Sequence, residues 1–123
     1  MEKSLFLQFI GDTPTTRIID FLIDNKGMDY SKTEIAEGAG ISRATLFKYW
    51  KKIEEFGIVK ETRRFGKTKL YSLNTENKLV QELLRLEAIL IREGMETAYK
   101  KAVAGRRAQV LAVVRNPKPR SKR

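Results

Sequence analysis

The sequence contains neither cysteine nor histidine among its 123 residues. Without a thiol or an imidazole the chain cannot form a disulfide, a zinc finger, or a Ser-His-Asp or Cys-His catalytic unit. No apolar run approaches the roughly 18 residues that a membrane span needs. The N-terminus has an acidic residue and no small-residue cleavage site, which argues against a signal peptide. We therefore expect a soluble, cytoplasmic protein that is not an enzyme and uses no cofactor or metal.

Charge is unevenly distributed along the chain. The net charge is +10, yet all 15 acidic residues lie in residues 1–96, while residues 97–123 hold nine of the 25 basic residues. Residues 115–123 contain two prolines and nothing to bury, which predicts a disordered cationic arm within a flexible tail over residues 105–123. Such an arm favours nucleic acid as its partner; a solubilising tail is the alternative. The predicted DNA contacts of the tail are Arg106, Arg107, Arg115, Lys118, Arg120, Lys122 and Arg123.

Three capping patterns predict three helices. Thr13 followed by Pro14 begins a helix over residues 14–25. Ser31 and Glu34 form a capping-box pattern for a short second helix, which stops at the glycines of residues 38–40. Ser42 caps a third helix over residues 43–56. The predicted core comprises Phe21, Leu22, Ile35, Leu46, Trp50, Ile53, Ile58 and Leu73.

After Gly57 the hydrophobic period changes from 3.6 to 2. Two strand-like runs, residues 58–63 and 69–73, flank a connection that contains Gly66, which predicts a β-hairpin. The hairpin is basic near its tip. There the predicted DNA-contacting residues are Arg63, Arg64, Phe65, Lys67 and Lys69.

The order of helix, short helix, tight turn, helix and hairpin carries a resemblance. With the pattern Ile35-Ala36-x-x-Ala39-Gly40-Ile41-Ser42-x-x-Thr45-Leu46 and the run 51–59, it resembles the winged helix-turn-helix domain of bacterial and archaeal transcription regulators. The resemblance covers about residues 14–74. It implies a mainly α fold with a small β-hairpin, in which residues 13–74 bind double-stranded DNA and residues 1–12 precede them as an apolar segment.

The resemblance makes the third helix the reader of the major groove, because its outward side is opposite Leu46, Trp50 and Ile53. Phe47 departs from the small polar residue usual there, and packs either on sugar and thymine methyl groups or on the domain itself. Lys51 and Lys52 are expected to contact backbone phosphates; the alternative is that one of them pairs with Glu54 or Glu55. The predicted contact residues are Ser42, Arg43, Ala44, Thr45, Phe47, Lys48, Lys51 and Lys52.

A long helix that starts at Glu76 is predicted after the hairpin, within a dimerisation segment over residues 75–104. Asn74 or Thr75 caps it, and Gly105 interrupts it. It carries two apolar stripes, one of which we expect to return to its own domain and the other to meet a second chain. A homodimer seam is predicted at Leu79, Leu83, Leu86 and Leu90, which follow a coiled-coil spacing. The N-terminal apolar segment could join that interface. A monomer whose helix packs wholly on its own core is the alternative.

Three functions are consistent with these sequence features. The first is a dimeric, sequence-specific DNA-binding transcription regulator. The second is a low-specificity architectural or plasmid-maintenance DNA-binding protein that uses the same surface. The third is a winged helix that serves as a protein-interaction module. No small-molecule ligand is evident from the residues.

Overall fold

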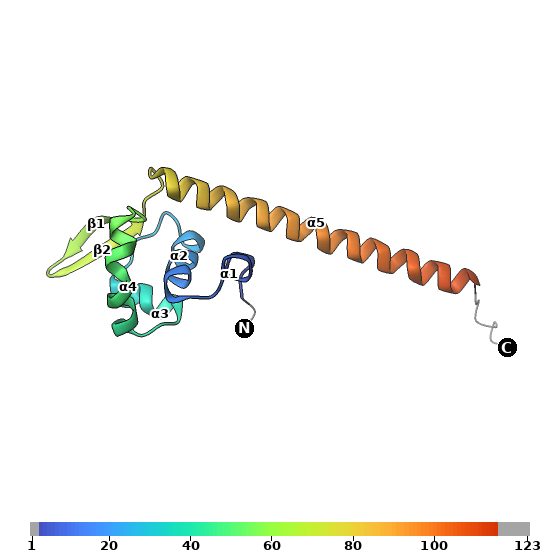
Figure 1. Cartoon of the computed structure of the whole chain (residues 1–123), viewed down its shortest axis with the longest axis horizontal. Helices are drawn as coiled ribbons and strands as arrows, with labels where there is room; N and C mark the ends of the chain where they lie inside the picture. The colour runs from blue at the N-terminus through green and yellow to red at the C-terminus, as the bar shows by residue number, and fades with distance from the viewer. Residues whose placement is uncertain (1–2, 116–123) are drawn as a thin grey trace. The chain divides into compact units, whose positions relative to one another are not determined.

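The computed structural model describes residues 3–115. Its elements are helices α1 (Leu5–Ile10), α2 (Pro14–Asp24), α3 (Lys32–Ala39) and α4 (Arg43–Glu55), strands β1 (Val59–Phe65) and β2 (Thr68–Leu73), and helix α5 (Lys78–Arg115) (Figure 1). This order confirms the predicted fold class. The chain divides into two compact units, one that ends at Leu90 and one that begins at Ile91. Helix α5 supplies residues to both.

The predicted caps begin helices α2, α3 and α4. The Thr13 hydroxyl accepts a hydrogen bond from the Thr16 amide at 3.2 Å. Ser31 and Glu34 form the predicted capping box, with the Glu34 carboxylate accepting from the Ser31 amide at 3.0 Å. The Ser42 hydroxyl accepts from the Thr45 amide at 3.1 Å. Each cap satisfies an amide that the helix itself leaves unpaired.

A tight turn joins α3 to α4. Gly40 adopts the left-handed conformation with φ +70°, and the Ile41 amide donates to the Ala36 carbonyl at 3.0 Å. Two residues earlier, Gly38 lies against the ring of Phe21, where a Cβ atom would come within 2.0 Å of a ring carbon. Both glycines are therefore needed for the close approach of α2, α3 and α4.

The hydrophobic core of the first unit lies between the helices and the hairpin. Ile18, Leu22, Ile35, Leu46, Ile53 and Val80 are fully buried. The predicted core positions are confirmed, except that Phe21 is half-buried and packs against the core, edge-on to Tyr30 at 5.1 Å between ring centroids.

Strands β1 and β2 form an antiparallel hairpin whose turn is shorter than predicted. Phe65 pairs with Thr68, so only Gly66 and Lys67 lie in the turn and the strands extend to residues 65 and 68. Gly66 has φ +57°, which allows this two-residue connection. Thr62 is an extra residue in β1, because the register shifts between Glu61 and Arg63.

Helix α1 belongs to the domain core. Phe6 and Leu7 are buried there, and the Ser4 hydroxyl caps the helix while donating to Asp20 at 2.9 Å. The N-terminal segment therefore packs on its own chain, whereas Leu5, Phe9 and Ile10 remain exposed.

Helix α5 corrects the sequence predictions at both ends. It begins at Lys78 rather than at residue 76, because the side-chain Oδ1 of Asn77 accepts from the amides of Leu79 and Val80 at 2.7 and 3.2 Å and so caps the helix. It then runs unbroken through Gly105 to Arg115. One glycine costs a helix only about 1 kcal/mol, and the alanine and arginine neighbours favour helix. Residues 105–115 are thus helical, not a flexible tail.

In the described part, residues 3–115, no helix is both long and apolar enough to cross a membrane. The same residues hold no group of three or more acidic side chains placed to bind a metal ion.

Candidate nucleic-acid interface

The inner flank of α4 fixes the helix to the domain. Leu46, Trp50 and Ile53 are each at most 2 % exposed, as the sequence predicts. Trp50 packs edge-on against Tyr71 of β2, with ring centroids 5.0 Å apart. Tyr71 in turn holds β2 to the segment before α3, because the backbones of Tyr30 and Tyr71 exchange two hydrogen bonds of 2.8 Å. The core thereby sets the orientation of α4.

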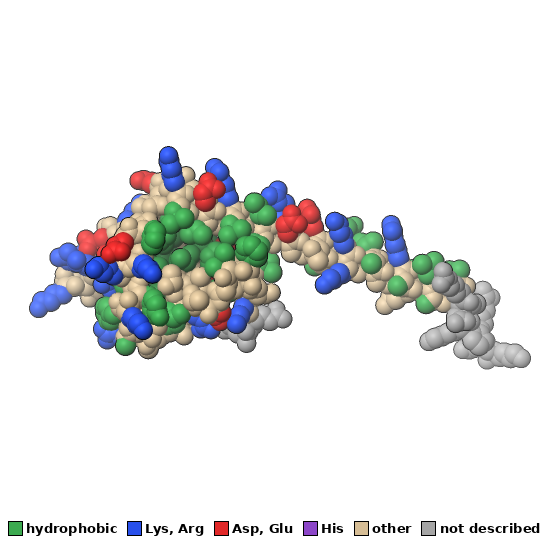
Figure 2. Space-filling model, viewed as in Figure 1, with side chains coloured by type: hydrophobic (Ala, Val, Ile, Leu, Met, Phe, Trp, Pro, Cys, Tyr) green, Lys and Arg blue, Asp and Glu red, His purple; other side chains and the backbone are tan. Residues whose placement is uncertain are grey.

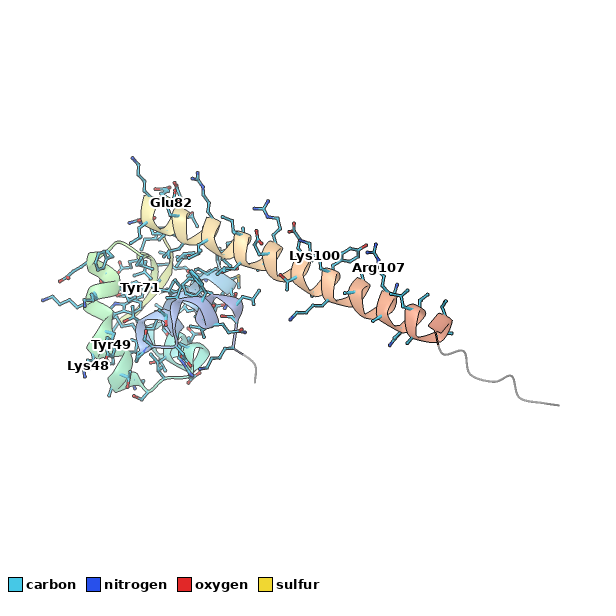
Figure 3. All side chains as sticks on the ribbon, turned by 45° about the vertical axis from the view of Figure 1, so that its right-hand side comes forward. Lys48, Tyr49, Tyr71, Glu82, Lys100 and Arg107 are labelled. Atoms are coloured by element: carbon cyan, nitrogen blue, oxygen red, sulfur yellow. The ribbon has the colours of Figure 1, made fainter. Side chains whose placement is uncertain are left out.

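The outer flank of α4 is open to solvent. Of the eight predicted contact residues, seven are exposed and Thr45 is half-buried (Ser42, Arg43, Ala44, Phe47, Lys48, Lys51 and Lys52 are the exposed ones). The Ser42 hydroxyl donates to the Thr45 hydroxyl at 2.8 Å, so the Thr45 proton is left to donate elsewhere. Lys48 and Tyr49 mark this helix in Figure 3.

The cations of α4 are almost free of acidic partners. Within residues 3–115, only Lys51 has a carboxylate in reach, that of Glu55 at 4.0 Å. This is the weak i, i+4 pair expected for one of the two lysines. Arg43, Lys48 and Lys52 form no ion pair in the described part of the chain.

Phe47 does not cover the core, because 51 % of it is exposed. Its ring lies between two cations. The Lys32 ammonium is 5.4 Å and the Arg43 guanidinium 5.9 Å from the ring centroid. Cation–π attraction of this kind holds both basic side chains near the N-terminal end of α4.

On the hairpin, in contrast to α4, most of the predicted basic contact residues have an acidic partner. Arg63 donates two hydrogen bonds to the Asp29 carboxylate, at 2.8 and 3.2 Å, and Thr62 donates a third at 2.7 Å. Donation by Arg63, more than that by Thr62, lowers the pKa of Asp29 below its usual range. Arg63 is thus tied to the segment that precedes α3.

The other predicted contact residues of the hairpin, Arg64, Phe65, Lys67 and Lys69, are all exposed. Arg64 and Lys69 each lie 3.7 Å from the carboxylate of Glu61. Lys67 has no ion-pair partner within residues 3–115, and the exposed ring of Phe65 lies under Arg63 at 5.3 Å. Figure 2 shows Lys and Arg side chains at the left of the first unit, where Figure 1 places the hairpin.

A shallow hollow of about 260 Å³ lies where α3, α4 and the hairpin meet. It brings together predicted residues of both surfaces, Arg43 and Phe47 from α4 and Lys67 and Lys69 from the hairpin. It adds residues that the sequence analysis missed, namely Ser31, Lys32, Thr33, Thr68 and Tyr71. The only sequence signal for Lys32 was its place directly after the Ser31 cap.

Three of the remaining predicted contacts, Arg106, Arg107 and Arg115, lie on α5. Arg106 and Arg107 are exposed in the second unit, where Figure 3 labels Arg107 and Lys100. Arg115 is the last residue of α5. Lys118, Arg120, Lys122 and Arg123 lie outside the described residues.

The predicted dimer seam is only partly open. Leu83 and Leu86 pack against the domain core, as do Leu84 and the fully buried Val80. Leu90 is half-buried and Leu79 is 43 % exposed. Both apolar stripes thus contribute to the domain itself, because the core accepts more than one side of the helix. The apolar residues of α5 that stay exposed include Ile89, Ile91, Met95, Tyr99, Val110, Leu111, Val113 and Val114.

No family model matches the chain, and no curated protein matches it. Solved structures do. An apo mutant of ZitR from Lactococcus lactis is 20% identical, with a TM-score of 0.58, over 80% of this chain and 81% of that chain. The chain has a winged-helix fold. MepR, a transcription regulator of the Staphylococcus aureus multidrug efflux pump MepA, is 12% identical, with a TM-score of 0.56, over 88% and 83% of the two chains.

Two further structures bear on ligands of winged-helix proteins. NadR in complex with 4-hydroxyphenylacetate is 19% identical to this winged-helix chain, with a TM-score of 0.54, over 93% and 81% of the two chains. Wild-type ZitR in complex with DNA is 20% identical, with a TM-score of 0.50, over 84% and 70%. ZitR is described as a zinc-responsive member of the MarR family.

Proposed function

We propose that this chain is a sequence-specific, double-stranded-DNA-binding transcription regulator that acts as a homodimer in the cytoplasm. In this proposal α4 enters the major groove, and the hairpin and the basic C-terminal residues contact the backbone. The outer flank of α4 carries the proposal, because Arg43, Lys48 and Lys52 are exposed and unpaired within residues 3–115. The likeness to ZitR, which has been solved with DNA, supports the same partner.

The donors on this flank suit base edges. Arg43 and Lys48 can donate to guanine O6 and N7 in the major groove. Thr45 retains its hydroxyl proton, since Ser42 donates to its oxygen. Phe47 offers an apolar surface beside them that suits a thymine methyl group.

Selection from a random duplex library, followed by competition between the selected and a scrambled duplex, tests this function. We expect the full chain to prefer the selected duplex. Lys48→Ala should relax the preference at one position by ~1–3 kcal/mol. The control Lys60→Ala, at an exposed lysine of β1, should retain it. Equal affinity of the wild type for both duplexes would overturn sequence specificity.

That outcome would favour a second candidate, an architectural DNA-binding protein with little base preference. The observation behind it is the concentration of nine basic residues and no acidic residue in residues 97–123. Backbone contacts from such a segment carry no sequence information. For this candidate, removal of residues 105–123 should lower affinity for every duplex and flatten its salt dependence.

The homodimer of the proposed regulator needs an apolar surface that the domain does not use itself. Met95, Tyr99, Val110 and Val113 are between 61 % and 71 % exposed on the second unit. At 100° per residue they lie within about 60° of arc, on one side of α5. Burial of four such side chains would contribute ~6–12 kcal/mol gross, before the entropy of ordering. This stripe replaces Leu83 and Leu86 in the proposed seam.

Sedimentation velocity tests the dimer. Tyr99→Lys places a charge on the stripe, whereas Thr97→Lys places the same charge about 160° away around the helix. We expect the wild type and Thr97→Lys to sediment as dimers and Tyr99→Lys as a monomer. A wild type that is monomeric at micromolar concentration would contradict the dimer.

A further inference from the structure

The hollow between α3, α4 and the hairpin combines side chains that lie far apart in the sequence. Its charged lining consists of Lys32 from α3, Arg43 from α4, Lys67 from the turn and Lys69 from β2. All four are cations, and no acidic residue lines the hollow. Glu61 lies 3.7 Å from Lys69 and offsets part of that one charge. Like charges held this close repel one another, so a bound anion would stabilise the arrangement.

Lys32 is one of the residues that line this hollow. Its ammonium nitrogen lies over three aromatic rings, at 5.4 Å from the centroid of Phe47, 5.5 Å from Trp50 and 5.8 Å from Tyr71. The side chain is half-buried, and it forms no ion pair with any acid in residues 3–115. The ring faces thus hold the ammonium in place without neutralising it.

The hollow also offers neutral donors. Thr33 and Thr68 bring hydroxyl groups to its lining, from α3 and β2 respectively. A tetrahedral anion with several oxygens can accept from ammonium, guanidinium and hydroxyl donors together. The volume of about 260 Å³ exceeds the roughly 30 Å³ share of one water, so it admits more than a solvent molecule.

We propose that this hollow seats one backbone phosphate of bound duplex DNA and that Lys32 is its central cation. The inference rests on the proposed DNA-binding function and adds a contact that the sequence analysis did not assign. A phosphate is favoured over a base, because the charged side chains that line the hollow are all cations and the hydroxyls of Thr33 and Thr68 add further donors. One phosphate held by α3, α4 and the hairpin would set the register of α4 along the groove.

The first test measures duplex affinity against salt for the full chain and three variants. Lys32→Gln and Lys32→Met both remove the charge, and the methionine retains the apolar stem that packs on the rings. Lys26→Gln is the matched control, because Lys26 is exposed and does not line the hollow. We expect both Lys32 variants to bind about fivefold more weakly at physiological salt, with a slope of log K against log salt smaller by about 0.9. The control should match the wild type.

A second measurement identifies the phosphate. Single neutral methylphosphonates are placed along the duplex, and each duplex is bound by the wild type and by Lys32→Met. One position should weaken the wild type and leave Lys32→Met unchanged, since that variant has already lost the contact. Circular dichroism confirms that both Lys32 variants are folded.

The outcomes separate the two proposals. A wild type that does not bind duplex DNA defeats the proposed function and this inference with it. A wild type that binds, with Lys32 variants equal to Lys26→Gln in affinity and slope, defeats the inference alone. The same holds if the wild type and Lys32→Met respond alike at every methylphosphonate position.

Discussion

Helix α4 and the β-hairpin each contribute four basic residues to the predicted contacts, but these residues differ in their acidic neighbours. On α4, Lys51 alone has a carboxylate within reach, at 4.0 Å, among the residues described. On the hairpin, three of the four cations have an acidic neighbour between 2.8 and 3.7 Å away (Arg63, Arg64 and Lys69). Equal counts of basic residues therefore conceal unequal availability.

This difference in ion pairing affects how strongly each surface would bind a polyanion such as DNA. A free cation gains a phosphate and releases a condensed counterion, whereas a paired cation must first give up its own carboxylate. We infer that α4 supplies most of the salt-dependent affinity. The hairpin is better suited to a fixed position, because the Asp29–Arg63 pair ties β1 to the segment before α3.

The largest effect is expected from removing the anchor of α4. Trp50 is 2 % exposed, so Trp50→Ala should lower the free energy of unfolding by about 3–5 kcal/mol. The substitution should disturb both surfaces, since Trp50 belongs to α4 and packs on Tyr71 of β2. Denaturant unfolding measures the change. Phe56→Ala, at a ring that is 58 % exposed, is the control and should change stability by less than about 0.5 kcal/mol. A similar loss in both variants would contradict the assigned anchor.

The next largest effect is expected from two double alanine substitutions, one on α4 and one on the hairpin. Lys48→Ala with Lys52→Ala removes two free cations, and the salt slope should fall by about 1.8. Arg63→Ala with Arg64→Ala removes two paired cations, and the slope should fall by less than about half as much. Fluorescence anisotropy with one duplex at several salt concentrations measures both. Equal falls in the slope for the two double variants would mean that paired and unpaired cations contribute alike to DNA binding.

Local signals in the sequence were sufficient for most of the fold. The Ser31 and Ser42 caps, the glycine turn at Gly40 and the 3.6-residue spacing of Leu46, Trp50 and Ile53 predicted α3, α4 and the buried side of α4. These features act over a few residues, and the structure confirms them. The break expected at Gly105 was wrong, because the strong helix formers around it outweigh one glycine.

The charge pattern of the site was beyond sequence reasoning. Asp29 and Arg63 are 34 positions apart, and Thr62, which donates to the same carboxylate, is the extra residue of β1 at the register shift. Lys32 joins the site only because α3, α4 and β2 meet at one hollow. Such contacts depend on how elements pack, which periodicity and capping do not specify.

The difference in ion pairing between α4 and the hairpin can be reduced by releasing one hairpin cation from its carboxylate. Asp29→Asn retains the shape of the side chain but releases Arg63 from its charged partner. Duplex affinity at physiological salt should rise by up to about fivefold, and the slope should increase by up to about 0.9. A fall in affinity would instead mean that Arg63 contacts DNA only while Asp29 positions it. Arg63→Ala in the Asp29→Asn background is the control and should abolish the gain.

The same variant should show a pH-dependent loss of stability. Arg63 lowers the pKa of Asp29 in the folded chain, so the pair stabilises the fold above the ordinary aspartate pKa of about 3.9. That contribution is lost as the pH falls through the folded-state pKa. Thermal unfolding should therefore show Asp29→Asn to be less stable than the wild type at pH 7, with the difference closing below about pH 4. A difference that stays constant with pH would contradict the ionic role of Asp29.

The smallest effect is expected at Glu61. Its carboxylate lies 3.7 Å from both Arg64 and Lys69, and all three side chains are between 44% and 54% exposed, so solvent already screens both pairs. Glu61→Gln should raise duplex affinity by no more than about twofold, less than Asp29→Asn, because it releases two weakly held cations rather than one held by two hydrogen bonds. Anisotropy titrations of the two variants on one duplex rank them. A larger gain for Glu61→Gln would mean that the long, exposed pairs of Glu61 restrain hairpin cations more than the hydrogen-bonded Asp29–Arg63 pair does.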